Sequence, residues 1–103
     1  MTPIFIAGPC VIESADLLDE VACELVRIKQ KFNIEIYFKA SFDKANRTSV
    51  HSYRGPGLEK GLQMLGEVRE KYGLKLLTDI HESFQAAPVG EVVDVLQLSL
   101  IHI

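Results

Sequence analysis

The amino-acid sequence predicts an α/β fold, namely the N-terminal half of a (β/α)8 barrel, with about four strand–helix units and parallel strands. Short apolar runs typical of strands alternate along the chain with longer segments of helical periodicity. The connections between strands are long enough to hold helices, as a parallel sheet requires. Polar residues also gather directly after each strand, which is where folds of this class place their binding sites.

The composition is that of one globular domain. The 103 residues are 48% hydrophobic and 24% charged, which is ordinary for a chain with a single core. A net charge of −3 and a pI near 5.5 argue against a nucleic-acid partner. No apolar run reaches membrane-spanning length and no signal peptide is apparent, so we expect no membrane partner and a cytoplasmic protein. Two cysteines are too few for a disulfide framework.

Four strands are expected, at residues 4–7, 34–39, 74–79 and 92–97. The first is wholly apolar and is bounded by Pro3 and Gly8, which is typical of a strand buried on both faces. The second is rich in β-branched and aromatic residues. No internal repeat or linker separates these strands, so the sequence predicts one continuous sheet.

The first helix is expected from about residue 15 to about residue 31. Ser14 can cap its N-terminus, and Asn33 can end it. Apolar residues recur at spacings of three and four and predict one buried face, on which Cys23 lies as a core residue. These apolar positions are Leu18, Val21, Ala22, Leu25, Ile28 and Phe32.

Two further helical segments complete the pattern. One carries Leu58, Leu62 and Leu65 on a single face and closes at Gly73, which suits a left-handed C-cap. The other is short, covers residues 84–90 and is expected to be interrupted by Pro88.

The most polar stretch of the chain follows the second strand, at residues 38–57. It holds four cations, four Ser or Thr residues, one Asn, one His and one Tyr, without strand or helix periodicity. Arg suits bidentate contacts to phosphate and Lys acts as a compact positive charge. The sequence therefore predicts a site for two or more anionic groups. No nucleotide-binding glycine motif, CxxC pair or HExxH motif is present.

Polar residues from all four strand ends are expected to converge on one rim. They are Cys10 and Glu13; Lys39, Lys44, Asn46, Arg47 and Ser49; Asp79, His81 and Glu82; and Gln97. Each also has a simpler interpretation. Lys39 could reach solvent, Cys10 could be a small buried hydrophobic residue, and His81 could be a hydrogen-bonded residue of the rim.

Five stretches of the sequence resemble the 3-deoxy-D-manno-octulosonate 8-phosphate synthases. They are AGPCVIES at residues 7–14, FKASFDKANRTS at 38–49, HSYRGPG at 51–57, TDIHE at 78–82 and VDVLQ at 93–97. The related 3-deoxy-D-arabino-heptulosonate 7-phosphate synthases carry Pro where this chain has Asn46. The resemblance covers the chain up to Gln97.

The resemblance implies a barrel enzyme of lipopolysaccharide biosynthesis that condenses phosphoenolpyruvate with D-arabinose 5-phosphate. Lys39 and Lys44 would bind phosphoenolpyruvate, while Asn46, Arg47 and Thr48 would hold the pentose phosphate. The expected catalytic residues are Lys44, Asp79 and His81, with Asp79 and His81 near the reacting carbons. His81 would donate to the developing alkoxide or order a water, and Gln97 would line the substrate site. The resemblance also implies a homotetramer.

The resemblance also changes the meaning of Cys10. Family members with Cys at this position depend on a divalent metal such as Zn, Fe or Mn, so Cys10 is expected to be a metal ligand whose companions lie beyond residue 103. Two alternatives stay open: a heptulosonate phosphate synthase that uses erythrose 4-phosphate, and an anion-binding fragment without catalysis.

The resemblance ends before the last residues. We expect residues 1–97 to be a partial barrel domain and residues 98–103 to be a non-native tail, because CTGTCTCTTATACACATC, a common sequencing-library adapter end, encodes LSLIHI in one frame. Family members are more than twice as long as this chain. A half barrel would leave strand edges and apolar surface exposed, so we expect the chain alone to be inactive.

Overall fold

The computed structural model describes residues 3–43 and 55–98. Strands and helices alternate along the chain, with a short 3-10 turn, η1, before the last helix. The elements are β1 (Ile4–Ala7), α1 (Ala15–Phe32), β2 (Glu35–Lys39), α2 (Leu58–Tyr72), β3 (Lys75–Ile80), η1 (Ser83–Gln85), α3 (Ala86–Gly90) and β4 (Val95–Leu98). This order confirms the predicted alternation.

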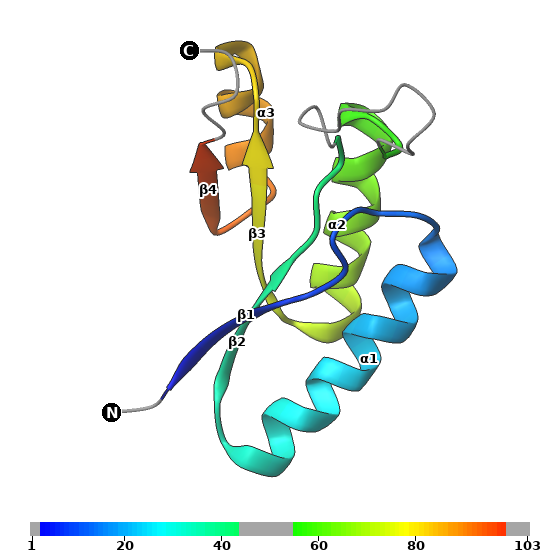
Figure 1. Cartoon of the computed structure of the whole chain (residues 1–103), viewed down its shortest axis with the longest axis vertical. Coiled ribbons are helices and arrows are strands. Elements are labelled where there is room, and N and C mark those ends of the chain that lie inside the picture. Colours follow the sequence, from blue (N-terminus) through cyan, green and yellow to red (C-terminus); the bar gives the residue numbers. More distant parts are fainter. Residues whose placement is uncertain (1–2, 44–54, 99–103) are drawn as a thin grey trace.

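The four strands form one parallel sheet in the order β1-β2-β3-β4. Neighbours in the sheet are therefore also neighbours in sequence, and each pair is joined by a connection that contains a helix. In Figure 1 the C-terminal ends of β3 and β4 point the same way. The predicted fold class, a partial (β/α)8 barrel with parallel strands, is confirmed in this arrangement.

One face of the sheet is covered by α1 and α2, which lie side by side in Figure 1. Residues of β2 alternate in burial, so that Ile36 and Phe38 are buried against these helices while Tyr37 and Lys39 are half-buried on the opposite face. The core lies between the sheet and the helices. It contains Ile12, Leu18, Ala22, Phe38, Ala40, Phe42, Met64, Leu65, Val68, Leu74, Leu76, Ile80, Val89 and Val93.

The predicted ends of α1 and α2 are confirmed. Ser14 is the N-cap of α1, and its Oγ accepts a hydrogen bond from the backbone N–H of Leu17 at 3.1 Å. Asn33 ends α1 in the left-handed conformation, with φ of 51°. Gly73 ends α2 in the same way. These local signals place both helices in the chain.

The prediction that the first strand is buried on both faces is wrong. Ile4, Phe5 and Ile6 of β1 are 61%, 51% and 60% exposed. The reason is that β1 is an edge strand whose only partner in the described sheet is β2. The other edge, β4, is exposed in the same way, with Leu98 at 69%. The expectation that a half barrel leaves its edges and apolar residues uncovered is therefore confirmed.

The start of the last strand was also predicted wrongly. β4 begins at Val95, not at residue 92, because the backbone N–H groups of Val92 and Val93 both donate to the carbonyl of Val89 in the turn that ends α3. The turn is fixed to β3 by Asp94, whose carboxylate accepts from the N–H of Leu76 at 2.8 Å.

Two predictions about α3 and α1 are corrected as well. Pro88 does not interrupt α3, because it lies in the first turn, where a backbone N–H needs no partner within the helix. Cys23 is exposed and is not a core residue. Phe32, the last residue of α1, is 61% exposed, so the buried face of this helix ends before it.

Among residues 3–43 and 55–98, no helix combines the length and the apolar character that crossing a membrane would require.

Candidate functional site

Three of the predicted site residues lie on one face of the sheet, near the C-terminal ends of their strands. Asp79 of β3 is directly opposite Gln97 of β4, and Lys39 of β2 is opposite Leu77, two residues before Asp79. Because side chains alternate along a strand and paired residues share a face, Lys39, Asp79 and Gln97 all project from the face that α1 and α2 leave uncovered. The sheet thus places these three residues on one face, and their roles in a site stay a prediction. Lys44, Asn46, Arg47 and Thr48 lie outside the described residues.

Cys10 and Lys39 line one pocket of about 210 Å³, at the ends of β1 and β2. Cys10 is exposed, so the simpler interpretation of it as a buried hydrophobic residue is wrong. Gly8 allows the close approach of these two strand ends, because a Cβ atom at this position would lie 1.9 Å from the carbonyl oxygen of Lys39. The pocket therefore joins the candidate metal ligand to the candidate anion-binding lysine.

A second group of polar residues surrounds Asp79. Its Oδ1 accepts a hydrogen bond from Ser41 Oγ at 2.6 Å, and its Oδ2 lies 3.5 Å from His81 Nε2. Ser41 is fully buried and Asp79 is 7% exposed. A carboxylate in such surroundings needs hydrogen-bond donors, and Ser41 supplies one. The structure thus fixes one orientation of the Asp79 side chain.

The ring of His81 is held between this carboxylate and the backbone that follows β2. Nε2 lies 2.6 Å from the carbonyl oxygen of Asp43, and the ring meets Phe42 edge to face at a centroid distance of 6.5 Å. A carbonyl oxygen can only accept, so Nε2 carries the proton. Nδ1 is buried and has no hydrogen-bond partner among the described residues. In the neutral ring this nitrogen is an acceptor.

The segment that precedes residues 44–54, which the sequence predicts to be a cationic loop, is firmly packed. Phe42 is 1% exposed, and its carbonyl oxygen accepts from the N–H of Gly57 at 3.0 Å. The carbonyl of Ser41 accepts from the N–H of Ile12 at 3.0 Å. Residues 41–43 are therefore tied both to the chain after the loop and to the segment after β1, and Lys44 follows them directly in sequence.

Sequence reasoning missed two residues that shape this site, Ser41 and Gln85. Gln85 is 7% exposed, and its Oε1 accepts from the N–H groups of His81 and Glu82 at 2.8 and 3.1 Å. It thereby fixes the turn after β3. The spacing of Glu82 and Gln85 is that of a capping box and could have indicated this role. Ser41 could have been found from strand alternation, since it lies two residues after Lys39.

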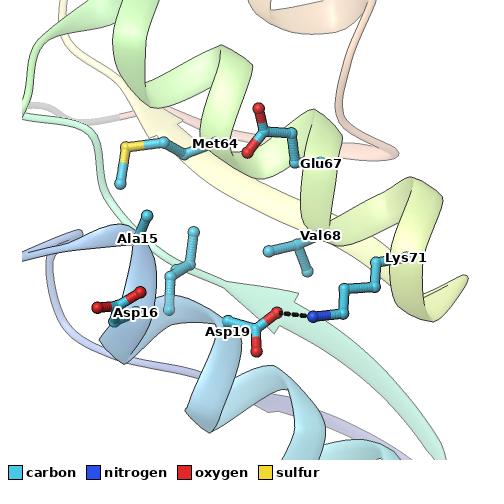
Figure 2. Close-up of a pocket in the computed structure, with 8 residues that line it drawn as sticks. Ala15, Asp16, Asp19, Met64, Glu67, Val68 and Lys71 are labelled. Atoms are coloured by element: carbon cyan, nitrogen blue, oxygen red, sulfur yellow. Dashed lines mark hydrogen bonds and ion pairs between the residues drawn. The ribbon is translucent and has the colours of Figure 1, made fainter.

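A separate hollow of about 390 Å³ lies between α1 and α2, away from the strand ends. Figure 2 shows its carboxylates, Asp16, Asp19 and Glu67, and the ion pair in which Lys71 Nζ lies 2.7 Å from Asp19 Oδ1. The hydrogen bond from Lys71 holds the pKa of Asp19 below its ordinary value, and the same contact raises the pKa of Lys71. This hollow belongs to the contact between two helices, and none of the predicted site residues lines it.

The family model for the DAHP synthetase I family matches residues 2–99. The chain belongs to the DAHP synthetase I family. Its four parallel strands and intervening helices are consistent with part of a barrel of this family.

Relatives in the DAHP synthetase I family include three proteins named 2-dehydro-3-deoxyphosphooctonate aldolase. The protein of Wolinella succinogenes is 62% identical over 95 residues, which are 92% of this chain and 36% of the relative. That of Campylobacter jejuni subsp. doylei is 63% identical over 95 residues, again 92% and 36%. That of Helicobacter pylori strain P12 is 55% identical over 96 residues, 93% of this chain and 35% of the relative. The chain thus spans about a third of the length of these relatives.

The expected metal centre needs further ligands beside Cys10. Within residues 3–43 and 55–98, no three His, Cys, Asp or Glu side chains come together in a way that could hold a metal ion. Cys10 is exposed and available as one ligand. One thiol does not make a metal site, so no chemical step is assigned through a metal here.

Proposed function

We propose that this chain forms the N-terminal part of a synthase that condenses phosphoenolpyruvate with D-arabinose 5-phosphate and releases inorganic phosphate. The product would be 3-deoxy-D-manno-octulosonate 8-phosphate, the eight-carbon sugar acid phosphate to which the relatives' name refers. The observation that carries the proposal is the set of Lys39, Asp79 and Gln97 on one sheet face beside the start of a cationic loop.

The electrostatic demand of this reaction fits the residues at the site. Two dianionic substrates repel each other, so an enzyme must neutralise their charge while it holds the enol carbon against the aldehyde. Lys39 and Lys44 would bind the carboxylate and phosphate of phosphoenolpyruvate. Asn46, Arg47 and Thr48 would hold the phosphate end of the pentose, with Arg47 suited to a bidentate contact.

Asp79, His81 and Gln97 would line the part of the site where carbon–carbon bond formation occurs. Asp79 is a fixed carboxylate at the C-terminal end of β3, and Gln97 faces it from β4. His81 would donate to the developing alkoxide or order a water. Lys44, the third expected catalytic residue besides Asp79 and His81, would place a positive charge close to the reacting phosphate.

The chain spans about 36% of the Wolinella succinogenes relative, so the activity proposed is that of a longer protein. A direct test is a chimera in which residues 3–97 of this chain replace the matching segment of that relative. We expect phosphate release from phosphoenolpyruvate that depends on arabinose 5-phosphate. Absence of that activity in a folded chimera, with the parent relative active in the same assay, would contradict the proposal.

A second candidate function is supported by the description of the family, which refers to DAHP synthetases. A synthase of that kind would use erythrose 4-phosphate in place of arabinose 5-phosphate. Asn46 argues against this second function, because the heptulosonate phosphate synthases carry Pro at the same position. The same chimera decides between the two substrates, since a clear preference for erythrose 4-phosphate would move the chain to the heptulosonate class.

The chain by itself could also act only as an anion-binding fragment. Its exposed strand edges, β1 and β4, are consistent with a sheet that does not close on itself. Titration of the 103-residue chain with phosphoenolpyruvate, followed by calorimetry, would show binding without turnover if this interpretation holds.

We further propose that Cys10 is a ligand to a divalent metal, Zn, Fe or Mn, which would orient substrate or water when bound. The chimera should then contain bound metal by elemental analysis and lose activity in chelator. Cys10→Asn should lower the metal content. A chimera that holds no metal and is insensitive to chelator would refute this assignment.

The homotetramer, the cytoplasmic location and the non-native nature of residues 98–103 stay predictions from the sequence.

A further inference from the structure

The imidazole of His81 links the end of β3 to the backbone just before the cationic loop. We propose that His81 is a positioning residue, which fixes the start of that loop through a hydrogen bond from Nε2 to the carbonyl oxygen of Asp43, 2.6 Å away. The inference rests on the proposed function and narrows the role of His81 within it.

The ring is held on several sides. The His81 side chain is 4% exposed, its edge-to-face contact with Phe42 has an interplanar angle of 63°, and Asp79 Oδ2 lies 3.5 Å from Nε2. Ser41 in turn holds Asp79 from the other carboxylate oxygen. Because Asp79 and the Asp43 carbonyl both present negative charge to Nε2, they favour a proton on that nitrogen. The two oxygens thus orient the ring.

This arrangement leaves Nδ1 without a hydrogen-bond partner in the part of the chain that the structure describes, and in the neutral ring Nδ1 has no proton. As a buried nitrogen it can accept a hydrogen bond only from a water enclosed beside it, and it cannot donate to a developing alkoxide. Of the two roles expected for His81, the neutral ring is therefore compatible with ordering a water and not with donation. The donor of the ring is already committed to the protein backbone.

The bond to Asp43 is placed where it affects substrate binding. Asp43 directly precedes Lys44 in the sequence, and Lys44 is the first positively charged residue after the second strand. Fixing the backbone before a binding residue lowers the conformational entropy lost when the ligand binds. Loss of the bond should therefore weaken the binding of phosphorylated substrates more than it slows the chemical step.

Two substitutions separate this role from direct proton transfer. The amide nitrogen of Gln can reach approximately the position of imidazole Nε2 and donate to the Asp43 carbonyl, whereas Asn is too short. In the chimera described above, His81→Asn should raise KM for phosphoenolpyruvate or arabinose 5-phosphate about tenfold, the equivalent of about one lost hydrogen bond. His81→Gln should restore KM to within about twofold of the parent.

The kinetic result would overturn the proposal in two ways. Equal losses of kcat in both variants, with KM unchanged and one limb of the pH–rate profile lost, would identify a proton donor. Parental kinetics in both variants would show that the Asp43 bond does not position the loop.

A spectroscopic test does not depend on activity. Long-range proton–nitrogen correlation spectra of the 103-residue chain should show the His81 ring protonated at Nε2, with the signal assigned by its loss in His81→Asn. A ring protonated only at Nδ1 would refute the proposal even if the chimera is an active synthase. Conversely, the expected tautomer in the 103-residue chain, together with an inactive chimera, would support the hydrogen bond and would count against the proposed function alone.

Discussion

Ser41 lies beyond the last residue of β2 but still donates a hydrogen bond to Asp79 at the site. Ser41 follows Lys39 by two positions, so it points to the same face of the sheet although β2 has ended. There it meets Asp79, and both residues are buried. A buried carboxylate without a donor is costly, which makes this hydrogen bond important to folding as well as to the site.

Ser41→Ala should therefore destabilise the protein by about 1–3 kcal/mol, because it leaves one oxygen of a buried carboxylate without its donor. Denaturant unfolding followed by circular dichroism would measure the change. Ser83→Ala is the matched control, since Ser83 is exposed in η1, and it should change the free energy of unfolding by less than about 0.5 kcal/mol. Equal effects of the two substitutions would contradict a special role for the Ser41 bond.

At the scale of elements, α2 packs through a glycine on Phe42, in the segment that follows β2. A Cβ atom on Gly61 would lie 2.3 Å from Cβ of Phe42, whereas one on Gly66 of the same helix would lie 4.0 Å from its nearest neighbour, Val92 Cγ1. The two glycines occupy the same kind of backbone but differ in the space around them. Only Gly61 is required by packing.

Alanine substitutions at these two glycines should consequently change the free energy of unfolding in opposite directions. Gly61→Ala should destabilise by about 1–3 kcal/mol, because Phe42 is fully packed and must shift. Gly66→Ala should stabilise by about 0.5–1 kcal/mol, because alanine favours a helix and meets no obstacle. Thermal unfolding of both variants gives the comparison. Stabilisation by both would mean that α2 does not approach Phe42 as closely as the structure shows.

The contact between α1 and α2 should respond to pH. Lys71 lowers the pKa of Asp19, so this ion pair contributes to stability above the ordinary pKa of an aspartate, and the contribution is lost as pH falls through the lowered value. Asp19→Asn should therefore be less stable than the parent at neutral pH, with the difference vanishing in acid. The pair is exposed and salt should weaken it.

Unfolding measured across the acid range, in low and high salt, checks this prediction. Glu20→Gln removes an exposed carboxylate of the same helix and serves as the control. A difference between Asp19→Asn and the parent that stays constant down to the most acid pH would show that the ion pair does not form.

The elements that sequence reasoning located well are those with local signals, and the residues it misjudged depend on distant partners. Ser14 and Asn33 mark the ends of α1 within a few residues of sequence. Whether the apolar β1 is buried depends on a neighbouring strand, and the exposure of Cys23 depends on which side of α1 meets the rest of the fold. The site follows the same rule. Convergence of Asp79 and Gln97 follows from parallel topology, and strand alternation places Ser41 on the same face. The partner of Ser41 on that face depends on the register of segments 38 residues apart, which no local pattern reveals.

At the scale of the whole molecule, the dominant feature of residues 3–43 and 55–98 is a sheet whose two edge strands carry exposed apolar side chains. β1 exposes Ile4, Phe5 and Ile6, and β4 exposes Leu98. Unpaired N–H and C=O groups on both edges are templates for another strand, and the apolar residues beside them gain free energy when covered. In a longer barrel the remaining strands would cover these edges. Within the described residues no further strand pairs with these edges, so they are available to other molecules.

We therefore expect the 103-residue chain to self-associate as its concentration rises, and the chimera to lack this edge-driven association because its own strands pair with β1 and β4. Ile6→Lys should suppress association of the short chain, since a charge on an edge strand opposes pairing and Ile6 contributes little to the core. Phe32→Lys is the control, because Phe32 is similarly exposed, at 61%, but lies at the end of α1 away from the strand edges. Sedimentation velocity over a range of concentrations measures the effect. A parent chain that stays monomeric throughout, or association abolished equally by Phe32→Lys, would show that the open edges are not what holds the molecules together.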